Sequence, residues 1–373
     1  YGYRDHRTDG MDAEVAKILP ETELYGKTGI QKQIFNTVYQ LMAVKQQTPE
    51  LLQQAKTLLM LPDYFGFRLT GNKLSEYTNG STTQLVNPDT FQWDKELIRK
   101  LGYPEDIFLP LQMPGTKVGQ LLPEIQKEVG FDLEVVLCGS HDTASAVMAV
   151  PQTEGDGIYI SSGTWSLMGI ESLKPVITED AAAANFTNEG GYDHRFRFLK
   201  NIMGLWMIQS VRHEYNDAYS FAQLCNMAEE SKEFPSRVDV NDQSFLSPDS
   251  MVEAIRQYCH KTGQPVPESV GELTSVVYRS LAQSYGETVR GLEKIAGKTY
   301  DSIHIIGGGS NAAYLNQLTA DATGKTVYAG PGEATAIGNL LAQMIHAGDL
   351  ADLKSARKCV RESFEIKTFA PAK

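Results

Sequence analysis

The sequence predicts an α/β protein with about two domains. Its 373 residues are enough for two domains of roughly 150 residues each. The hydrophobic share of 42% and the charged share of 21% are ordinary for globular proteins, which excludes a disordered or fibrous chain. In the last third of the chain, strands, glycine-rich turns and helices follow one another, and this succession is typical of α/β domains.

The first 130 residues are expected to be mainly helical. Apolar residues recur at helical spacing over 35–42, and a leucine-rich segment follows over 51–71. Residues 81–94 contain an Asn-Pro dipeptide and are expected to form a loop. A further helix is predicted over Lys95–Leu101, because Gly102 stops it.

The pattern changes near residue 130, where β-branched residues become frequent. Residues 133–140 predict a buried strand that opens into a loop, and 141–150 predict a helix of small residues. Two apolar runs around a Ser-Ser-Gly-Thr turn predict a β-hairpin over 157–171. A loop is expected over 178–194 and an apolar helix over 200–215.

The last third carries the clearest pattern. After a polar, loop-rich segment without a regular pattern, a long amphipathic helix is predicted, and strands alternate with helices beyond it. These segments are the polar stretch 211–270, the helix 273–297, the strand 302–310, the helix 312–324, the strand 326–330 and the helix 333–348.

Charge and cysteine content make several classes of partner less favoured. The net charge is −12 and no long run of like charge occurs, so nucleic-acid and anionic-membrane binding are disfavoured. No apolar run approaches the ~20 residues of a membrane span. The four cysteines lack metal-binding spacing and indicate reduced thiols in a cytoplasmic protein. The sequence leaves the oligomeric state open, and a monomer is compatible with it.

Two glycine-containing turns are candidates for holding phosphate. A strand ending in Gly307-Gly308-Gly309-Ser310 lets a ligand approach the backbone closely at the start of a helix. The spacing is not that of a dinucleotide-binding fingerprint, so an ordinary tight turn remains an equal alternative. The turn 161–164 is expected to offer two exposed hydroxyl groups and a glycine, although by itself a plain hairpin turn is favoured. A third such turn, 330–333, strengthens the phosphate-binding interpretation.

His141, Asp142 and Thr143 directly follow the predicted strand 133–140. An acidic residue in a loop after a strand is well placed for catalysis in an α/β sheet. Asp142 would act as the general base if it faced a substrate hydroxyl, as in phosphoryl transfer to an alcohol. The alternative is that Asp142 caps the following helix, and the two roles do not exclude each other.

Long strings throughout the chain resemble the FGGY family of sugar kinases, which belongs to the actin and hexokinase superfamily. The resemblance covers almost the whole sequence and is far more specific than any single turn. The strings are YRDHRTDGM (3–11), TGIQKQIFNTVYQL (28–41), LMLPDYFGFRLTGNKLSEYTNGSTTQLVN (59–87), HDTASAV (141–147), YISSGTWSLMGIE (159–171), NFTNEGG (185–191), LKNIMGLWMIQ (199–209), QPVPES (264–269) and IIGGGSNAAYLNQLTADATG (305–324).

The resemblance implies two actin-like (ribonuclease H-like) domains around a cleft. Residues 1–149 would be the sugar-side domain and residues 150–373 the ATP-side domain. Within the family, the strings are most similar to kinases that use ATP and Mg²⁺ to phosphorylate the 1-hydroxyl of L-rhamnulose. A kinase for another ketose or polyol, such as fuculose, xylulose or glycerol, and a non-catalytic nucleotide- or sugar-binding relative remain alternatives.

The resemblance also implies a role for seven residues, although it identifies no metal ligand. Asp142 matches the catalytic base. The sugar-contacting positions are His141, Asp142, Thr143 and Asn201, and the ATP-contacting positions are Thr164, Gln209 and Gly308.

One family feature has no counterpart in the sequence. Family members begin with a strand and a glycine-bearing phosphate turn, whereas the present sequence opens YGYRDHRTDG. The expectation is therefore a fragment with an incomplete first domain and little or no activity of its own.

Overall fold

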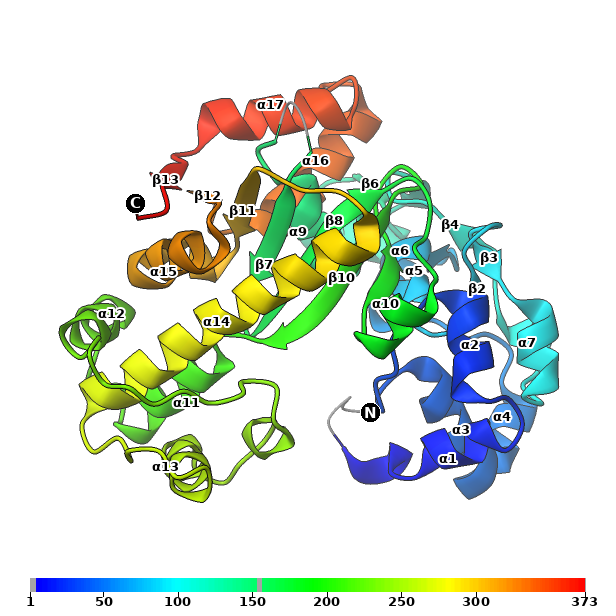
Figure 1. Cartoon of the computed structure of the whole chain (residues 1–373). Coiled ribbons are helices and arrows are strands. Elements are labelled where there is room, and N and C mark those ends of the chain that lie inside the picture. Colours follow the sequence, from blue (N-terminus) through cyan, green and yellow to red (C-terminus); the bar gives the residue numbers. More distant parts are fainter. Residues whose placement is uncertain (1–4, 153–155, 373) are drawn as a thin grey trace. The chain divides into compact units, whose positions relative to one another are not determined.

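The computed structural model describes residues 5–152 and 156–372, which form two compact units (Figure 1). Each unit is assembled from separate stretches of sequence. Unit 1 comprises residues 1–148, 171–199 and 335–356, and unit 2 comprises residues 149–170, 200–334 and 357–373, masked positions aside. The predicted α/β class is confirmed. The division of the chain into domains at residue 149 stays a prediction.

Unit 1 is mainly helical. Its core is one apolar cluster in which α1 and α3 pack together, with Val38, Leu85 and Leu97 fully buried. Its helices are α1 (Met11–Ala16), α2 (Glu21–Thr28), α3 (Thr37–Gln47), α4 (Pro49–Gln54), α5 (Leu61–Thr70), α6 (Tyr77–Ser81), α7 (Lys95–Lys100), α8 (Pro123–Val129), α9 (Asp142–Met148), α10 (Glu179–Ala183) and nearly all of α16 (Ala334–Ala347).

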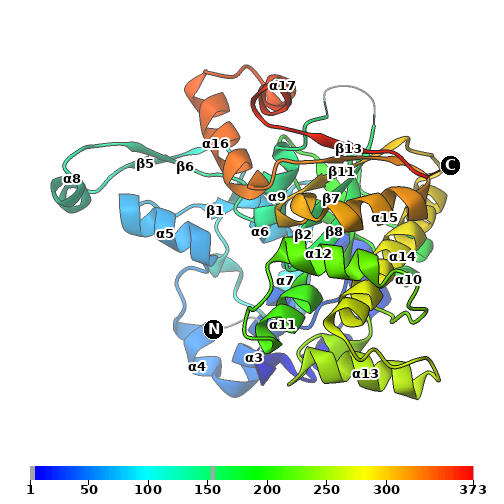
Figure 2. The same ribbon diagram turned by 90° about the vertical axis from the view of Figure 1, so that its left-hand side faces the viewer.

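Short strand pairs connect these helices. β1 pairs in parallel with β4, and the pairs β2–β3 and β5–β6 are antiparallel. Figure 2 shows the β5–β6 ribbon beside α5, with α8 at its far end. The strands of these pairs are β1 (Ser75–Glu76), β2 (Val86–Asn87), β3 (Gln92–Trp93), β4 (Leu111–Gln112), β5 (Lys117–Gln120) and β6 (Glu134–Val136). Unit 1 also contains β9 (Thr187–Gly190), which belongs to a larger sheet.

A mixed sheet of seven strands has the order β13-β12-β11-β7-β8-β10-β9. β11 runs parallel to both β7 and β12, while the β7–β8, β9–β10 and β12–β13 pairs are antiparallel. The further strands are β7 (Ile158–Ser162), β8 (Trp165–Ser172), β10 (Phe196–Met203), β11 (Ser302–Ile306), β12 (Thr326–Ala329) and β13 (Lys367–Phe369). The chain passes between the units within β8 and β10.

The long helix α14 (Val270–Ala296) packs against α12 and α15 in unit 2 (Figure 1). A capping box of Ser269 and Glu272 starts it, and Gly297 ends it in the left-handed conformation. The hydroxyl groups of Tyr285 and Ser166 lie 2.6 Å apart, which links α14 to β8. The remaining helices are α11 (Trp206–Glu214), α12 (Phe221–Glu230), α13 (Met251–Lys261), α15 (Ala313–Thr323) and α17 (Leu353–Ser363).

The structure confirms the helices predicted over 95–101, 141–150 and 273–297, the hairpin over 157–171 and the alternation after residue 302. Three predictions are wrong. The expected loop 178–194 contains α10 and β9, the expected helix 200–215 begins as β10, and the polar stretch 211–270 contains α12 and α13. β9 and β10 form because they pair with each other, and single-segment propensity does not reveal such pairing.

The predicted buried strand 133–140 is also shorter and more exposed than expected. Only Glu134–Val136 are extended, and all three side chains are half-buried because β6 belongs to the two-stranded ribbon with β5. The short pairing of β2 with β3 lies within the segment 81–94 that was expected to be a loop.

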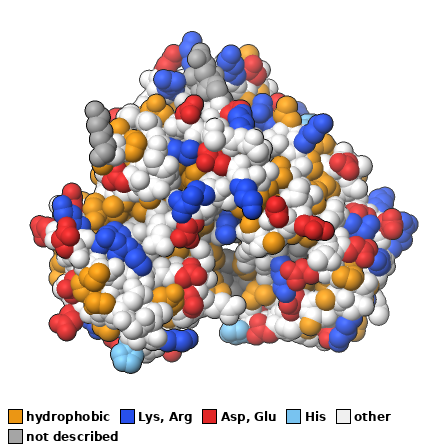
Figure 3. Space-filling view, viewed as in Figure 1, with side chains coloured by type: hydrophobic (Ala, Val, Ile, Leu, Met, Phe, Trp, Pro, Cys, Tyr) orange, Lys and Arg blue, Asp and Glu red, His pale blue; other side chains and the backbone are white. Residues whose placement is uncertain are grey.

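Acidic and basic side chains alternate over the face in Figure 3, which shows no large basic area. Among the described residues, no helix combines the length and apolar character needed to cross a membrane.

Candidate active site

Asp142 is the first residue of α9, at the end of the loop that follows β6. Its Oδ1 accepts hydrogen bonds from the Thr143 backbone N–H at 2.6 Å and from the Thr143 hydroxyl at 3.2 Å. The side chain is exposed, and Oδ2 accepts no hydrogen bond from the described residues. The N–H groups of Ala144 and Ser145 donate to the His141 carbonyl, so the described contacts do not include the predicted capping bond from Asp142. The other carboxylate oxygen of Asp142 is available to a ligand, which is compatible with the predicted role as a base.

A second carboxylate, Glu76, holds the loop before Asp142. Glu76 is fully buried at the end of β1, and its oxygens accept from both the backbone and the side chain of Thr78 and from the Asn79 N–H. Glu76 Oε2 also accepts from the Ser140 hydroxyl at 2.6 Å and from the Ser140 N–H at 3.2 Å. The same carboxylate thus caps α6 and fixes the residue two positions before Asp142.

Glu76 has an acidic neighbour. Asp63 on α5 is buried, and its Oδ1 accepts the backbone N–H of Glu76 at 3.2 Å, while its Oδ2 has no hydrogen-bond partner among the described residues. Burial raises the pKa of Asp63 to about 7, and the charge of Glu76 acts in the same direction. Burial also raises the pKa of Glu76, although its many hydrogen-bond donors oppose this effect.

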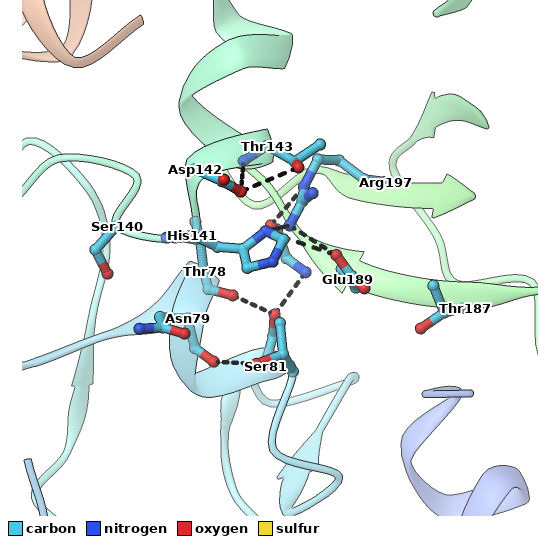
Figure 4. Close-up of polar contacts among 12 residues, drawn as sticks. Thr78, Asn79, Ser81, Ser140, His141, Asp142, Thr143, Thr187, Glu189 and Arg197 are labelled. Carbon is cyan, nitrogen blue, oxygen red and sulfur yellow. Dashed lines mark hydrogen bonds and ion pairs between the residues drawn. The ribbon is translucent and has the colours of Figure 1, made fainter. Parts of the chain in front are cut away.

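His141 contacts a buried ion pair (Figure 4). Arg197 on β10 is fully buried, and its Nη2 lies 3.1 Å from His141 Nδ1 and 3.2 Å from Glu189 Oε2. Arg197 Nε also donates to the carbonyl of Gly190 at 3.0 Å. Burial lowers the pKa of His141, Arg197 adds to this effect, and Glu189 and Asp142 oppose it.

Gly190 makes this arrangement sterically possible. A Cβ at this position would overlap the ring of Tyr77, so β9 can approach α6 only with glycine here. The Gly190 N–H donates to the Ser81 hydroxyl at 2.8 Å, and that hydroxyl donates in turn to the Thr78 carbonyl at 2.7 Å. The string NEGG therefore has a packing role that places Glu189 beside Arg197.

Helix α16 packs closely against α9 within unit 1. A Cβ on Gly338 would overlap the carbonyl of Ser145, so the close approach of the two helices requires glycine. Thr335 Oγ1 also donates to the Asp142 carbonyl at 3.3 Å. Asp142 therefore lies at the start of a helix that is fixed both by the loop bound to Glu76 and by the packing of α16.

The ATP-contacting residues suggested by the sequence lie in unit 2. Thr164 is exposed in the turn between β7 and β8, and its carbonyl accepts the Trp206 N–H at 3.2 Å. The Gly163 carbonyl accepts the Leu205 N–H at 2.9 Å. These bonds hold the turn against the start of α11, the helix on which the half-buried Gln209 lies.

The glycine-rich turn after β11 packs on the same hairpin. Gly307 has φ +82°, and a Cβ there would lie 2.8 Å from the Ser162 carbonyl. A Cβ on Gly309 would overlap the Ser162 side chain. A Cβ on Gly308, in contrast, would meet no atom within 4 Å. Two of the glycines are thus explained by packing, whereas Gly308 is the position at which a ligand could approach the backbone.

The structure brings His141, Asp142 and Thr143 together at the start of α9 and gathers the turns of Thr164 and Gly308 around Ser162. The turn 330–333 joins the latter group, since the Gly307 N–H donates to the Pro331 carbonyl at 3.0 Å. Asn201 lies on β10 in unit 2, and its buried Oδ1 has no hydrogen-bond partner among the described residues.

Sequence reasoning missed four charged residues that support the site: Asp63, Glu76, Glu189 and Arg197. A signal existed for Arg197, since a cation within the apolar run FRFL must be buried together with a partner. Nothing local distinguishes Asp63 or Glu76 from surface acids, because their burial depends on segments far away in the sequence.

The described residues contain no group of three or more His, Cys, Asp and Glu side chains that could hold a metal ion. Mg²⁺ usually keeps several waters and takes one or two carboxylates plus substrate phosphates, so a magnesium-nucleotide complex does not require such a group.

Comparisons with known proteins match both halves of the chain to one family. Residues 2–149 match the N-terminal domain of the FGGY family of carbohydrate kinases, and residues 158–347 match its C-terminal domain. The Rhamnulokinase of Halalkalibacterium halodurans is 52% identical over 99% of this chain and 79% of its own length. The Rhamnulokinase of Bacillus subtilis is 46% identical over 99% of this chain and 76% of its own length.

Solved structures show the same fold at low identity. The xylulose kinase of Lactobacillus acidophilus superposes with a TM-score of 0.77 at 16% identity, over 99% of this chain and 74% of that one. The glycerol kinase of Plasmodium falciparum gives a TM-score of 0.75 at 15% identity, over 99% and 74% of the two chains. With both family domains matched in order and close relatives along nearly its whole length, the chain belongs to the FGGY family of carbohydrate kinases.

Proposed function

We propose that the protein transfers the γ-phosphoryl group of ATP to the 1-hydroxyl of L-rhamnulose, giving ADP and L-rhamnulose 1-phosphate. The observation that carries the substrate assignment is the similarity to proteins named Rhamnulokinase, about half identical over 99% of this chain. The available Oδ2 of Asp142 supports a base-assisted transfer to an alcohol.

Asp142 acts as the general base in this proposal. Its carboxylate takes the proton of the C1 hydroxyl as that oxygen forms a bond to the γ-phosphorus of ATP. The bond between the γ-phosphorus and the bridging oxygen to the β-phosphate breaks, and ADP leaves with that oxygen. The Glu76–Ser140 hydrogen bonds hold the loop before Asp142. The Asp142 carboxylate is therefore already in position before the sugar binds, and the reaction carries no cost for fixing this loop.

His141 and Thr143 would bind sugar oxygens beside Asp142, and Asn201 would contribute a further polar contact. Thr164, Gln209 and Gly308 would contact ATP, which agrees with their grouping around the β7–β8 turn and the start of α11. Magnesium bound to the ATP phosphates would offset their negative charge.

Coupled assays of ADP release with magnesium-ATP test the proposal. The sequence as given and the whole gene product that contains it would each be assayed with L-rhamnulose, L-fuculose, D-xylulose and glycerol. We expect sugar-dependent ADP release from the whole gene product, greatest with L-rhamnulose. A preference for another sugar would change the substrate but retain the mechanism. A folded protein that binds ATP and phosphorylates none of the four sugars would contradict the proposal.

A further inference from the structure

The contact between Arg197 and His141 restricts the chemistry of the imidazole ring. A guanidinium group carries only hydrogen-bond donors, so a histidine nitrogen 3.1 Å from Arg197 Nη2 can serve only as an acceptor. That nitrogen is Nδ1. In the neutral ring, the proton must then be on Nε2.

The surroundings of Arg197 keep the guanidinium in place. The side chain is fully buried, its Nη2 forms an ion pair with Glu189 Oε2 at 3.2 Å, and the Gly190 carbonyl accepts from Nε at 3.0 Å. Glu189 is itself 7% exposed. A buried guanidinium with these two partners cannot turn away from His141 without leaving a buried carboxylate unpaired, which is strongly unfavourable.

Glu189 is the group that would favour the opposite tautomer. Its Oε2 lies 3.7 Å from His141 Nδ1 and would attract a proton on that nitrogen if Arg197 were absent. Arg197 Nη2 lies closer to both groups than they lie to each other, so its positive charge opposes a proton on His141 Nδ1. The desolvation that lowers the pKa of His141 also favours the neutral ring.

We infer that Arg197, held by Glu189, is a positioning residue that fixes His141 as a neutral imidazole donating from Nε2 to an oxygen of the sugar. The identity of the bound sugar rests on the function proposed above. Two adjacent residues would then recognise opposite features of one substrate. His141 would donate to an oxygen lone pair, while Asp142 would accept the hydrogen of a hydroxyl group.

Nitrogen-15 NMR of the histidine rings in the wild-type protein, without sugar, tests the tautomer directly. The His141→Asn variant identifies the signals of His141 among the seven histidines of the chain. Between pH 6 and 9 we expect Nδ1 to have the chemical shift of an unprotonated nitrogen and Nε2 that of a protonated one. A protonated Nδ1 in this range would overturn the inference, and this result does not depend on any enzymatic activity.

Two substitutions separate positioning from a merely structural role. Arg197→Lys keeps a donor-only cation and should keep the wild-type tautomer. Arg197→Met removes the donor, so the proton should move to Nδ1 beside Glu189. If Arg197→Met does not fold, the wild-type spectrum and Arg197→Lys still decide the question.

Kinetics provide the second measurement. Arg197→Met should raise the KM for the sugar by roughly tenfold to a hundredfold, the typical worth of such a hydrogen bond, and leave the KM for ATP unchanged. Equal changes in both KM values, with the wild-type tautomer retained, would indicate a structural role and contradict the inference. If no sugar is phosphorylated but His141 shows the expected tautomer, the proposed function fails while the assignment to Arg197 stands.

Discussion

The hydroxyl of Ser140 lies 2.6 Å from Oε2 of Glu76, a residue 64 positions earlier in the sequence. Glu76 is fully buried, so this hydrogen bond anchors the loop before Asp142 to the interior of unit 1. A carboxylate accepts hydrogen bonds at several positions, and Glu76 uses this capacity for the start of α6 and for the loop together. Asp142 therefore owes its position to a residue that does not touch it.

Replacing Glu76 with glutamine should weaken both functions of this carboxylate. The side chain keeps its shape, but the amide nitrogen is a donor and would face another donor at one of the two oxygen positions. We expect a loss of about 1–3 kcal/mol in the free energy of unfolding and a lower kcat. Denaturant unfolding and the ADP-release assay measure the two effects.

Ser140→Ala is the matched control, because it removes one donor and leaves the carboxylate unchanged. Its loss of stability should be about 1 kcal/mol. Equal stability of Glu76→Gln and the wild type would show that the charge of Glu76 is not needed to hold the loop.

Asp63 should make the protein less stable as the pH rises. Its pKa is about 7 in the folded protein and near 3.8 when unfolded, so the folded state binds more protons between these values. The stabilisation is fully present below about pH 4 and is lost as the pH rises through about 7. It amounts to a few kcal/mol at most.

The change can be measured by urea unfolding at intervals between pH 4 and 8, comparing the wild type with Asp63→Asn. Asparagine keeps an oxygen for the Glu76 N–H but does not titrate. The difference in stability between the two proteins should therefore vary with pH, and a constant difference would mean that Asp63 is ionised throughout this range.

Asp142→Asn should abolish most of the activity and leave the fold unchanged. The amide oxygen can still accept from Thr143, so the start of α9 is retained, but no base remains for the sugar hydroxyl. We expect kcat to fall by about 10²–10⁴-fold or more. Calorimetric titration with ATP should give the wild-type affinity, whereas an unchanged kcat would remove Asp142 from the mechanism.

Gly338→Ala should destabilise unit 1 because the added methyl group overlaps the Ser145 carbonyl. A cost of about 1–3 kcal/mol is expected, since α9 and α16 must move apart. Gly26→Ala on α2 is the control: a Cβ there meets no atom within 4 Å, so the substitution should be neutral or stabilise by about 0.5–1 kcal/mol. Thermal unfolding distinguishes the two variants.

Alanine substitutions at two neighbouring glycines in the turn after β11 should have different effects on stability and ATP affinity. Gly308→Ala adds a methyl group where no protein atom lies within 4 Å, so stability should be unchanged and ATP affinity should fall by about tenfold or more. Gly309→Ala should instead lower the stability, because its Cβ overlaps Ser162. If Gly308→Ala binds ATP with wild-type affinity, the turn at Gly308 does not contact the nucleotide.

The local pattern of apolar residues in the sequence was sufficient to predict the helices and strands that determine the fold class. The helix α14 and the alternation after residue 302 are visible in the sequence because each buries one regular face. β9 and β10 were missed because Thr187–Gly190 is extended only through pairing with Phe196–Leu199. Likewise, Asp142 follows a recognisable strand, whereas the roles of Glu76 and Arg197 arise from contacts between segments that are distant in the sequence.

The close packing of α9 and α16 has a consequence for biosynthesis. Thr335 contacts a residue 193 positions earlier, so α9 leaves the ribosome long before its partner helix does. At 5–20 residues per second, the delay is about 10–40 s. During this interval the Gly338-facing side of α9 lacks the partner that covers it in the finished protein, so unit 1 reaches its native state only after most of unit 2 has been synthesised.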